Sequence, residues 1–213
     1  MVVLTCNRTV PQQTLPDQAA DPVASSTPVL QKTPDAMIPT SDLVRPEDFS
    51  YLGAFRLPDA EGRPRTFEYG GAAMAFRPDG DPSGPTDGFP GSLFLAGHDR
   101  LPYGELPDGN QLAEVSIPAP VNSRDPAGLP QASFLQPFTD VARGAFQGLD
   151  ELPRLALLYL DRPETGPKLH LAWGQHFQLD PPQPSHSWLN PDLAGAELQS
   201  PWFVGDHSLY SVN

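Results

Sequence analysis

Short apolar runs, separated by turns rich in proline and glycine, make up the chain from about residue 42 onward. Runs this short, bounded by turn residues, predict β-strands. Residues 154–160 and 168–177 are two such runs, and the turn residues 161–167 that join them predict a hairpin. The segments expected to form strands are residues 51–57, 67–76, 91–98, 111–117, 154–160 and 168–177.

The second, third and fourth runs differ in how polar residues alternate with apolar ones. Residues 67–76 and 91–98 are apolar without strict alternation, which is typical of strands covered on both faces. Residues 111–117 alternate, and the alternation places Glu114 and Ser116 on one side of the strand. These three runs are expected to form an antiparallel meander.

Helical signals are scarce. Twenty-eight prolines and 18 glycines among 213 residues interrupt regular structure, so long helices are not expected. Residues 118–137 are turn-rich, and residues 139–147 predict one short helix with Thr139 as its N-cap. The expected fold class is therefore all-β with at most one short helix.

The N-terminal part has a different composition. Residues 1–41 are rich in Pro, Gln, Ser, Thr and Ala without a sustained period, which predicts a flexible leader before a folded domain at residues 42–213. Cys6 follows Val-Leu-Thr, as at the end of a bacterial lipoprotein signal, which suggests a lipid anchor and an extracytoplasmic location. Only five residues precede Cys6, fewer than a signal peptide requires, so a truncated start and a chance thiol are the alternatives.

The charge balance excludes some partners. Thirteen Lys and Arg against 26 Asp and Glu give a net charge of -13, which repels nucleic acid and anionic lipid surfaces. The same excess suits cation binding or simple solubility. No apolar run approaches the length of a transmembrane helix.

Oxygen-bearing side chains recur at a regular spacing in the turn after the second run. Asp79, Asp81, Ser83 and Asp87 occupy the first, third, fifth and ninth positions around a glycine at the sixth. A hard cation such as Ca²⁺ takes several oxygen ligands from one short segment, and the glycine permits the sharp turn that brings them together. The spacing predicts a calcium site; the other interpretation is a solvated loop of residues that turns favour.

Three histidines follow strand ends. His98, His176 and His207 have this position, and Asp99 lies beside the first of them. If the strand ends converge, these side chains would bind a transition metal or supply a general base. The alternative is that each histidine satisfies backbone groups or faces water at a strand-to-loop junction.

Tryptophan and the remaining strand histidines give a third set of candidates. Trp173, Trp188 and Trp202 offer stacking surfaces for sugars, although core packing is the commoner use of aromatic side chains on strands. His170 alternates with leucines and is expected on one sheet face, whereas His186 is expected in a loop.

Several short motifs resemble the opening blades of bacterial secreted β-propeller-like proteins of unassigned function. They are Phe-Glu-Tyr-Gly-Gly at residues 67–71, Gly-Ser-Leu-Phe at 91–94, Gly-His-Asp at 97–99 and Ala-Glu-Val-Ser-Ile-Pro at 113–118. The resemblance covers residues 49–213, and it implies a propeller-like fold and an extracytoplasmic address (periplasmic, cell-envelope or secreted) without implying an activity.

The calcium loop and the chain end bear on the same resemblance. Residues 79–87 resemble the hairpin calcium loops of integrin-type propellers, with Ser83 in place of an aspartate. Residues 208–213 alternate like a strand and then stop without a turn, which predicts a truncated chain, because an incomplete ring of blades leaves strand edges unpaired.

Two functions follow as hypotheses, and whether the chain is an enzyme stays open. The first is an extracytoplasmic binding or scaffold module for a protein or carbohydrate ligand, stabilised by calcium. The second is a metal-dependent hydrolase or lyase acting on a carbohydrate or phosphoester. Its candidate catalytic residues are His98, Asp99, His176 and His207.

Overall fold

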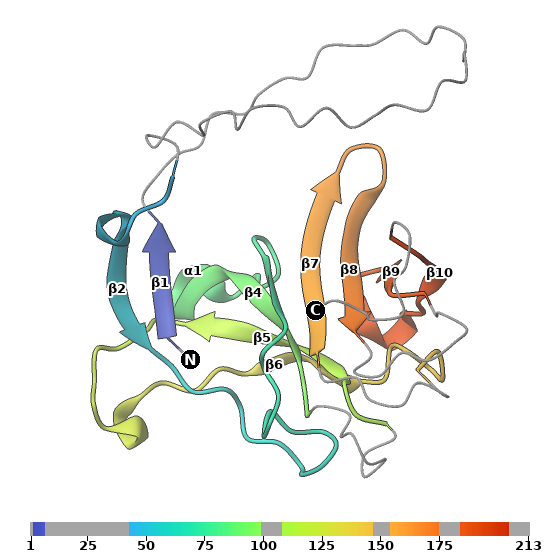
Figure 1. The fold of residues 1–213 in the computed structure, drawn as a ribbon. Helices are drawn as coiled ribbons and strands as arrows, with labels where there is room; N and C mark the ends of the chain where they lie inside the picture. Colours follow the sequence, from blue (N-terminus) through green and yellow to red (C-terminus); the bar gives the residue numbers. More distant parts are fainter. Residues whose placement is uncertain (1, 7–42, 99–107, 147–153, 175–183, 205–213) are drawn as a thin grey trace, which may run out of the picture. The chain divides into compact units, whose positions relative to one another are not determined.

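The structure, a computed structural model, describes residues 2–6, 43–98, 108–146, 154–174 and 184–204 (Figure 1). The chain divides into two compact units, Leu4–Leu52 and the remainder. Strands dominate the described residues, and the only α-helix among them is the four-residue α1 (Gly84–Asp87). The expected all-β fold class is therefore confirmed.

A two-stranded sheet pairs β1 (Val2–Cys6) with β2 (Phe49–Ala54), and the 3-10 turn η2 (Pro46–Asp48) precedes β2. β2 covers most of the first expected strand. β1 lies within the segment expected to be a leader, and residues 7–42 lie outside the described residues. The leader and the lipid anchor at Cys6 stay predictions.

The first sheet consists of four antiparallel strands, each beside its neighbour in sequence. In order they are β3 (Met74–Arg77), β4 (Gly88–Ala96), β5 (Leu112–Pro118) and β6 (Phe134–Thr139). The expected meander of three strands is therefore confirmed and gains β6 as a fourth strand. The 3-10 turn η3 (Pro126–Gly128) lies between β5 and β6.

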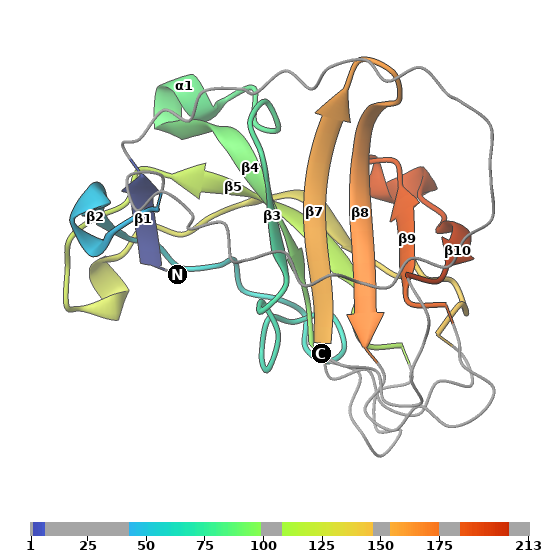
Figure 2. The same ribbon diagram turned by 45° about the horizontal axis from the view of Figure 1, so that its top comes forward.

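The second sheet repeats this arrangement (Figure 2). Its strands are β7 (Arg154–Arg162), β8 (Gly166–Gly174), β9 (His186–Leu189) and β10 (Gln199–Trp202), again antiparallel and consecutive. β7 and β8 form the predicted hairpin, with unbroken register from Arg154 opposite Gly174 to Arg162 opposite Gly166. The 3-10 turn η4 (Leu193–Gly195) separates β9 from β10.

Two sequence predictions about secondary structure were wrong. Thr139 ends β6, and residues 140–146 form turns in place of the expected helix. The carboxylate of Asp140 accepts the backbone N–H groups of Ala142 and Arg143, and Arg143 has a φ of 43°, a left-handed conformation that a helix does not accommodate. His186, expected in a loop, is the first residue of β9.

The second expected strand is also shorter than its apolar pattern suggested. Only Met74–Arg77 pairs with β4, whereas the preceding residues form turns. Tyr69 and Gly71 have φ values of 54° and 74°, so the backbone there leaves the extended conformation. A Cβ on Gly70 would lie 2.0 Å from the carbonyl oxygen of Gly97, so this turn depends on the small size of glycine.

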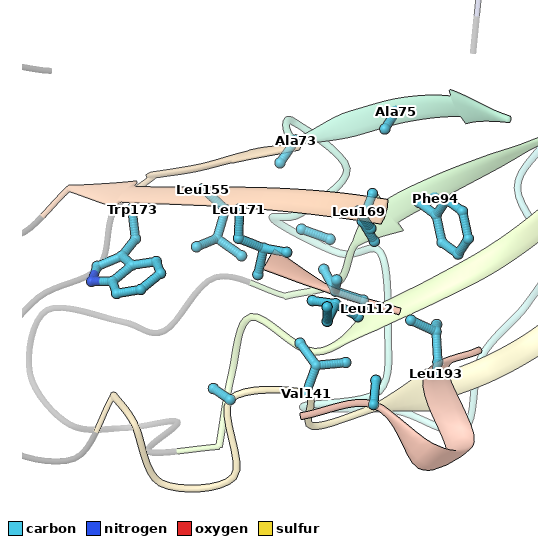
Figure 3. Close-up of a cluster of buried hydrophobic side chains, with 14 of the residues drawn as sticks. Ala73, Ala75, Phe94, Leu112, Val141, Leu155, Leu169, Leu171, Trp173 and Leu193 are labelled. Carbon is cyan, nitrogen blue, oxygen red and sulfur yellow. The ribbon is translucent and has the colours of Figure 1, made fainter. Parts of the chain in front are cut away.

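The inner faces of the two sheets share one apolar core (Figure 3). Phe94 and Leu112 of the first sheet lie in the same cluster as Leu169, Leu171 and Trp173 of the second. The described residues of β3 and β7, each at an edge of its sheet, are also in contact. The two sheets therefore pack face to face through apolar side chains that both of them contribute.

The opposite face of the first sheet is covered as well. Leu93, Leu95, Val115 and Ile117 pack there with Phe55, which is fully buried. β4 and β5 are thus buried on both faces. This was expected for β4 from its unbroken apolar run, but the alternation in β5 had indicated one polar face.

Candidate functional site

The loop with calcium-like spacing is held largely by its own side chains. Asp79, which is exposed, lies 3.3 Å from the guanidinium of Arg77. Asp81 is only 1% exposed, and its Oδ1 accepts hydrogen bonds from the backbone N–H and the hydroxyl of Ser83. Its Oδ2 is buried and has no hydrogen-bond partner among the described residues. Asp79, Ser83 and Oδ1 of Asp81 therefore have partners already, and Oδ2 of Asp81 has none among the described residues.

The second half of the same loop folds into α1. Ser83 is its N-cap residue, and the backbone oxygen of Ser83 accepts the N–H and the hydroxyl of Thr86. The side chain of Asp87 lies outside the described residues. In the described part of the chain, no three His, Cys, Asp or Glu side chains are grouped to hold a metal ion. The calcium site stays a prediction.

Of the candidate catalytic residues, only His98 can be placed. His98 is fully buried, its ring makes an edge contact with Tyr69 at 5.5 Å between centroids, and its backbone oxygen accepts the N–H of Asn110. Asp99, His176 and His207 lie outside the described residues. The convergence of the three histidines stays a prediction.

A buried carboxylate lies at the packed interface of the sheets. Glu114, in β5, is 2% exposed and accepts hydrogen bonds from the hydroxyl of Ser92 and the side-chain amide of Gln136. The guanidinium of Arg77 lies 3.6 Å from it. A Cβ on Gly80 would lie 1.7 Å from the hydroxyl oxygen of Ser92, so the loop backbone packs directly on this group. A buried carboxylate with several donors is held in one position.

Gln136 connects this carboxylate to the second sheet. Its amide nitrogen donates to the carbonyl of Pro191 at 2.8 Å, and its oxygen accepts the backbone N–H of Leu193 at 2.7 Å. These two bonds fix which end of the amide faces Glu114. Sequence alternation had placed Glu114 on a polar strand face, and no sequence signal indicated that the second sheet covers that face.

Tyr159 of β7 lies beside the same region. Burial raises the pKa of the Tyr159 hydroxyl above its ordinary value of 10.0, the carboxylate of Asp79 raises this pKa further, and the guanidinium of Arg77 lowers it. The ring of Tyr159 stacks on Phe94 with centroids 6.4 Å apart. Because burial and packing explain these features, they indicate a structural role for this polar cluster.

A pocket of about 310 Å³ lies on the surface near β6. Asp59, Glu61 and Arg65 line it together with the rings of Phe134 and Phe138. Glu61 pairs with Arg65 at 3.6 Å, and both side chains are well exposed. Exposed, mutually paired charges at its rim do not define a reactive group.

The side of the second sheet that faces away from the core forms the strongest candidate site. Opposed residues of antiparallel strands point to the same face, and Leu169, Leu171 and Leu189 define the inner one. Their neighbours in sequence therefore point outward. We call the following residues the outer face: Leu158, Lys168, His170, His186, Trp188 and Trp202.

The register of β7, β8 and β9 places three of these side chains in one row. Leu158 lies opposite His170, and His170 lies opposite Trp188. Leu158 is 55% exposed, and the other two are half-buried. Neither buried apolar cluster includes any of them.

A β-bulge brings Trp202 to the same face. Gln199 and Trp202 are three residues apart and yet lie opposite Trp188 and His186, which are two apart. Ser200, between them, has a φ of 36°, which is unusual for a residue other than glycine. The extra residue turns the Trp202 ring to within 6.3 Å of the His186 ring. Without the bulge, Trp202 would point to the opposite side from Gln199.

The sequence indicated part of this face. The alternation around His170 predicted its place on a sheet face, and Trp173 is 7% exposed in the core, as the core-packing interpretation expected. Trp188 and Trp202 point outward instead. The alternation of His186-Ser187-Trp188-Leu189 was a signal for β9, whereas no local pattern indicated the bulge at Ser200.

No family model, curated protein or solved structure matches this chain. Among the residues that the structure describes, no helix is long and apolar enough to cross a membrane.

Proposed function

We propose that this chain is a propeller-like, extracytoplasmic module that binds a ligand on the outer face of its second sheet and performs no chemistry on it. The observation that supports this function is the outer face itself. The outward side of one sheet gathers two indoles and two imidazoles, and a bulge with a strained residue is needed to bring one of them there. Bulges and strained residues concentrate at functional sites.

The sheets suit a rigid support for such a surface. Each is a four-stranded antiparallel meander of consecutive strands, and successive sheets pack face to face, as successive blades of a propeller do. Polar bonds from Gln136 to the segment after β9 add a directional link between the two sheets. The propeller-like arrangement is proposed on this basis, and the extracytoplasmic location on the motifs at residues 67–118 and on Cys6.

Calcium belongs to the proposal as a stabiliser of the loop at residues 79–87. The supporting feature is Oδ2 of Asp81, a buried carboxylate oxygen without a partner among the described residues. Such an oxygen is costly unless a cation or a donor satisfies it. The hydrolase or lyase hypothesis has no comparable support, because the imidazole of His98 is fully buried.

Acrylamide quenching of tryptophan fluorescence tests the binding function. Trp173 is buried, so quenching reports mainly on Trp188 and Trp202. The full chain is titrated with neutral oligosaccharides, anionic oligosaccharides and peptides, and each ligand is then analysed for cleavage. We expect at least one class to protect the indoles and to be recovered intact. Unprotected indoles with every class, or cleavage of a ligand, would contradict the proposal.

A further inference from the structure

The charges on the outer face differ from those of the whole chain. Acidic residues outnumber basic ones by 26 to 13 in the sequence, yet β7 to β10 contain only one, Asp161. Asp161 alternates with Tyr159 and Leu157, which pack against the core, so its Cβ points to the inner side. No carboxylate therefore occupies an outward position on the described strands of the second sheet.

Positive residues do occupy outward positions there, and the side chains of two of them, Lys168 and Arg162, are described. Lys168 lies opposite Leu160, and Arg162 follows Leu160 at the next outward position of β7. Nζ of Lys168 lies 4.9 Å from the ring centroid of Trp188 and 3.2 Å from Oδ1 of Asn190. No carboxylate of the described residues lies within ion-pair distance of either basic side chain. Lys168 is thus held in place by neutral groups, and its charge is not neutralised by the described residues.

The indole and imidazole side chains beside Lys168 suit a ligand whose rings have polar edges. The indoles of Trp188 and Trp202 lie on adjacent strands and provide flat apolar surfaces, which stack on the C–H faces of pyranose rings. His170 lies opposite Trp188 and His186 lies opposite Trp202, and both supply hydrogen-bonding nitrogens. Oγ of Ser185 fixes the His186 ring through Nδ1 at 2.8 Å. A few polar groups placed among aromatic surfaces are typical of small-ligand sites.

We infer that the outer face binds a saccharide bearing carboxylates, that is, a uronate-containing chain, with its sugar rings on Trp188 and Trp202 and a carboxylate on Lys168. This inference rests on the proposed binding function and names its ligand class. A uronate chain combines C–H faces for the indoles with an anion for the ammonium. A peptide of acidic residues alone would match the charge but offers no rings for the two indoles.

Calorimetric titration of the full chain tests the inference with three matched probes. They are an oligogalacturonate, the same oligosaccharide with its carboxylates methyl-esterified, and poly-glutamate. We expect the oligogalacturonate to bind at least about tenfold more tightly than either of the others, because each lacks one half of the recognition. Its affinity should also weaken as salt is added.

Variants of the face sharpen the test. Lys168→Gln should lower the affinity for oligogalacturonate about tenfold and leave the affinity for its methyl ester unchanged. Trp188→Ala should lower both. The matched controls are Arg124→Gln and Phe76→Ala, an exposed base and an exposed aromatic that do not belong to the outer face, and they should change neither affinity. Circular dichroism and melting curves establish that each variant is folded.

The other outcomes separate the ligand class from the binding function. Equal affinity for the ester would overturn the carboxylate assignment, and tighter binding of poly-glutamate would assign the face to an acidic protein partner. In both cases the binding function would stand. If no probe binds, the inference is wrong, and the quenching experiment with other ligands decides the function separately.

Discussion

The carboxylate of Glu114 provides the sharpest test of how the two sheets are held together. Glu114→Gln keeps the side chain's shape and removes its charge. The amide orientation of Gln136 is fixed by Pro191 and Leu193, so the new glutamine must turn its oxygen toward Gln136. Its NH₂ group then faces Ser92, whose hydroxyl donates to the carboxylate in the unchanged protein, and Arg77, whose guanidinium lies beside that carboxylate.

The cost can be worked from these contacts. Ser92 can rotate its hydroxyl to accept, so one hydrogen bond is exchanged and not lost. Arg77 loses a charged partner at 3.6 Å, and its side chain is 27% exposed, so water offsets part of that loss. Hydrogen bonds to charged groups contribute about 1.5–3 kcal/mol each, and we therefore expect Glu114→Gln to lower the free energy of unfolding by about 2–3 kcal/mol. For a chain of this size the melting temperature should fall by about 5–10 °C.

Urea unfolding, followed by far-ultraviolet circular dichroism, measures this loss. Glu197→Gln is the control, because Glu197 also pairs with an arginine, Arg143, at 2.6 Å, but both side chains are largely exposed. Exposed pairs contribute about 0–1 kcal/mol, so the control should change little. A Ser92→Ala double-mutant cycle should show coupling of about 0.5 kcal/mol or more with Glu114. Equal losses in Glu114→Gln and the control would refute the reasoning.

Two further changes test the loop and its surroundings. Because the pKa of Tyr159 is raised, the folded state holds this proton more tightly than the unfolded state, and stability should fall as the pH rises above the ordinary tyrosine value of 10.0. Urea unfolding on both sides of that pH should show a smaller fall in Tyr159→Phe, and an equal fall would contradict the raised pKa. Millimolar calcium should raise the melting temperature, because binding adds about 2.7 kcal/mol to the free energy of unfolding when the calcium concentration is 100 times Kd. Asp81→Asn, which keeps an oxygen for Ser83, should abolish this rise, and wild-type protein that melts alike in calcium and in chelator would remove the calcium site.

Most strands were predictable because their signals are local. Period-two alternation and turn residues act over a few positions, and they located β4, β5 and the β7–β8 hairpin within a few residues. β6 was missed since its short sequence contains Pro137 and follows a turn-rich stretch. The helix expected from Thr139 failed because β6 runs as far as Thr139 and because Arg143 takes a left-handed conformation that a helix does not accommodate.

The sites were less predictable, because their partners are distant in sequence. The spacing of residues 79–87 located a loop, but not that Asp79 pairs with Arg77 or that Asp81 is buried. The sequence placed His170 on a sheet face, but not the neighbours that the register gives it.

By itself, the sequence determined that this protein is built from short antiparallel strands in meanders. Proline, glycine and the alternation of apolar with polar residues act on the backbone over only a few positions. Only the tertiary structure decided which faces are covered. Glu114 became a buried link because the second sheet packs over it, and Trp202 reached the outer face because one extra residue at Ser200 shifts the register. Both outcomes depend on pairings between segments far apart in the chain, which no local pattern specifies.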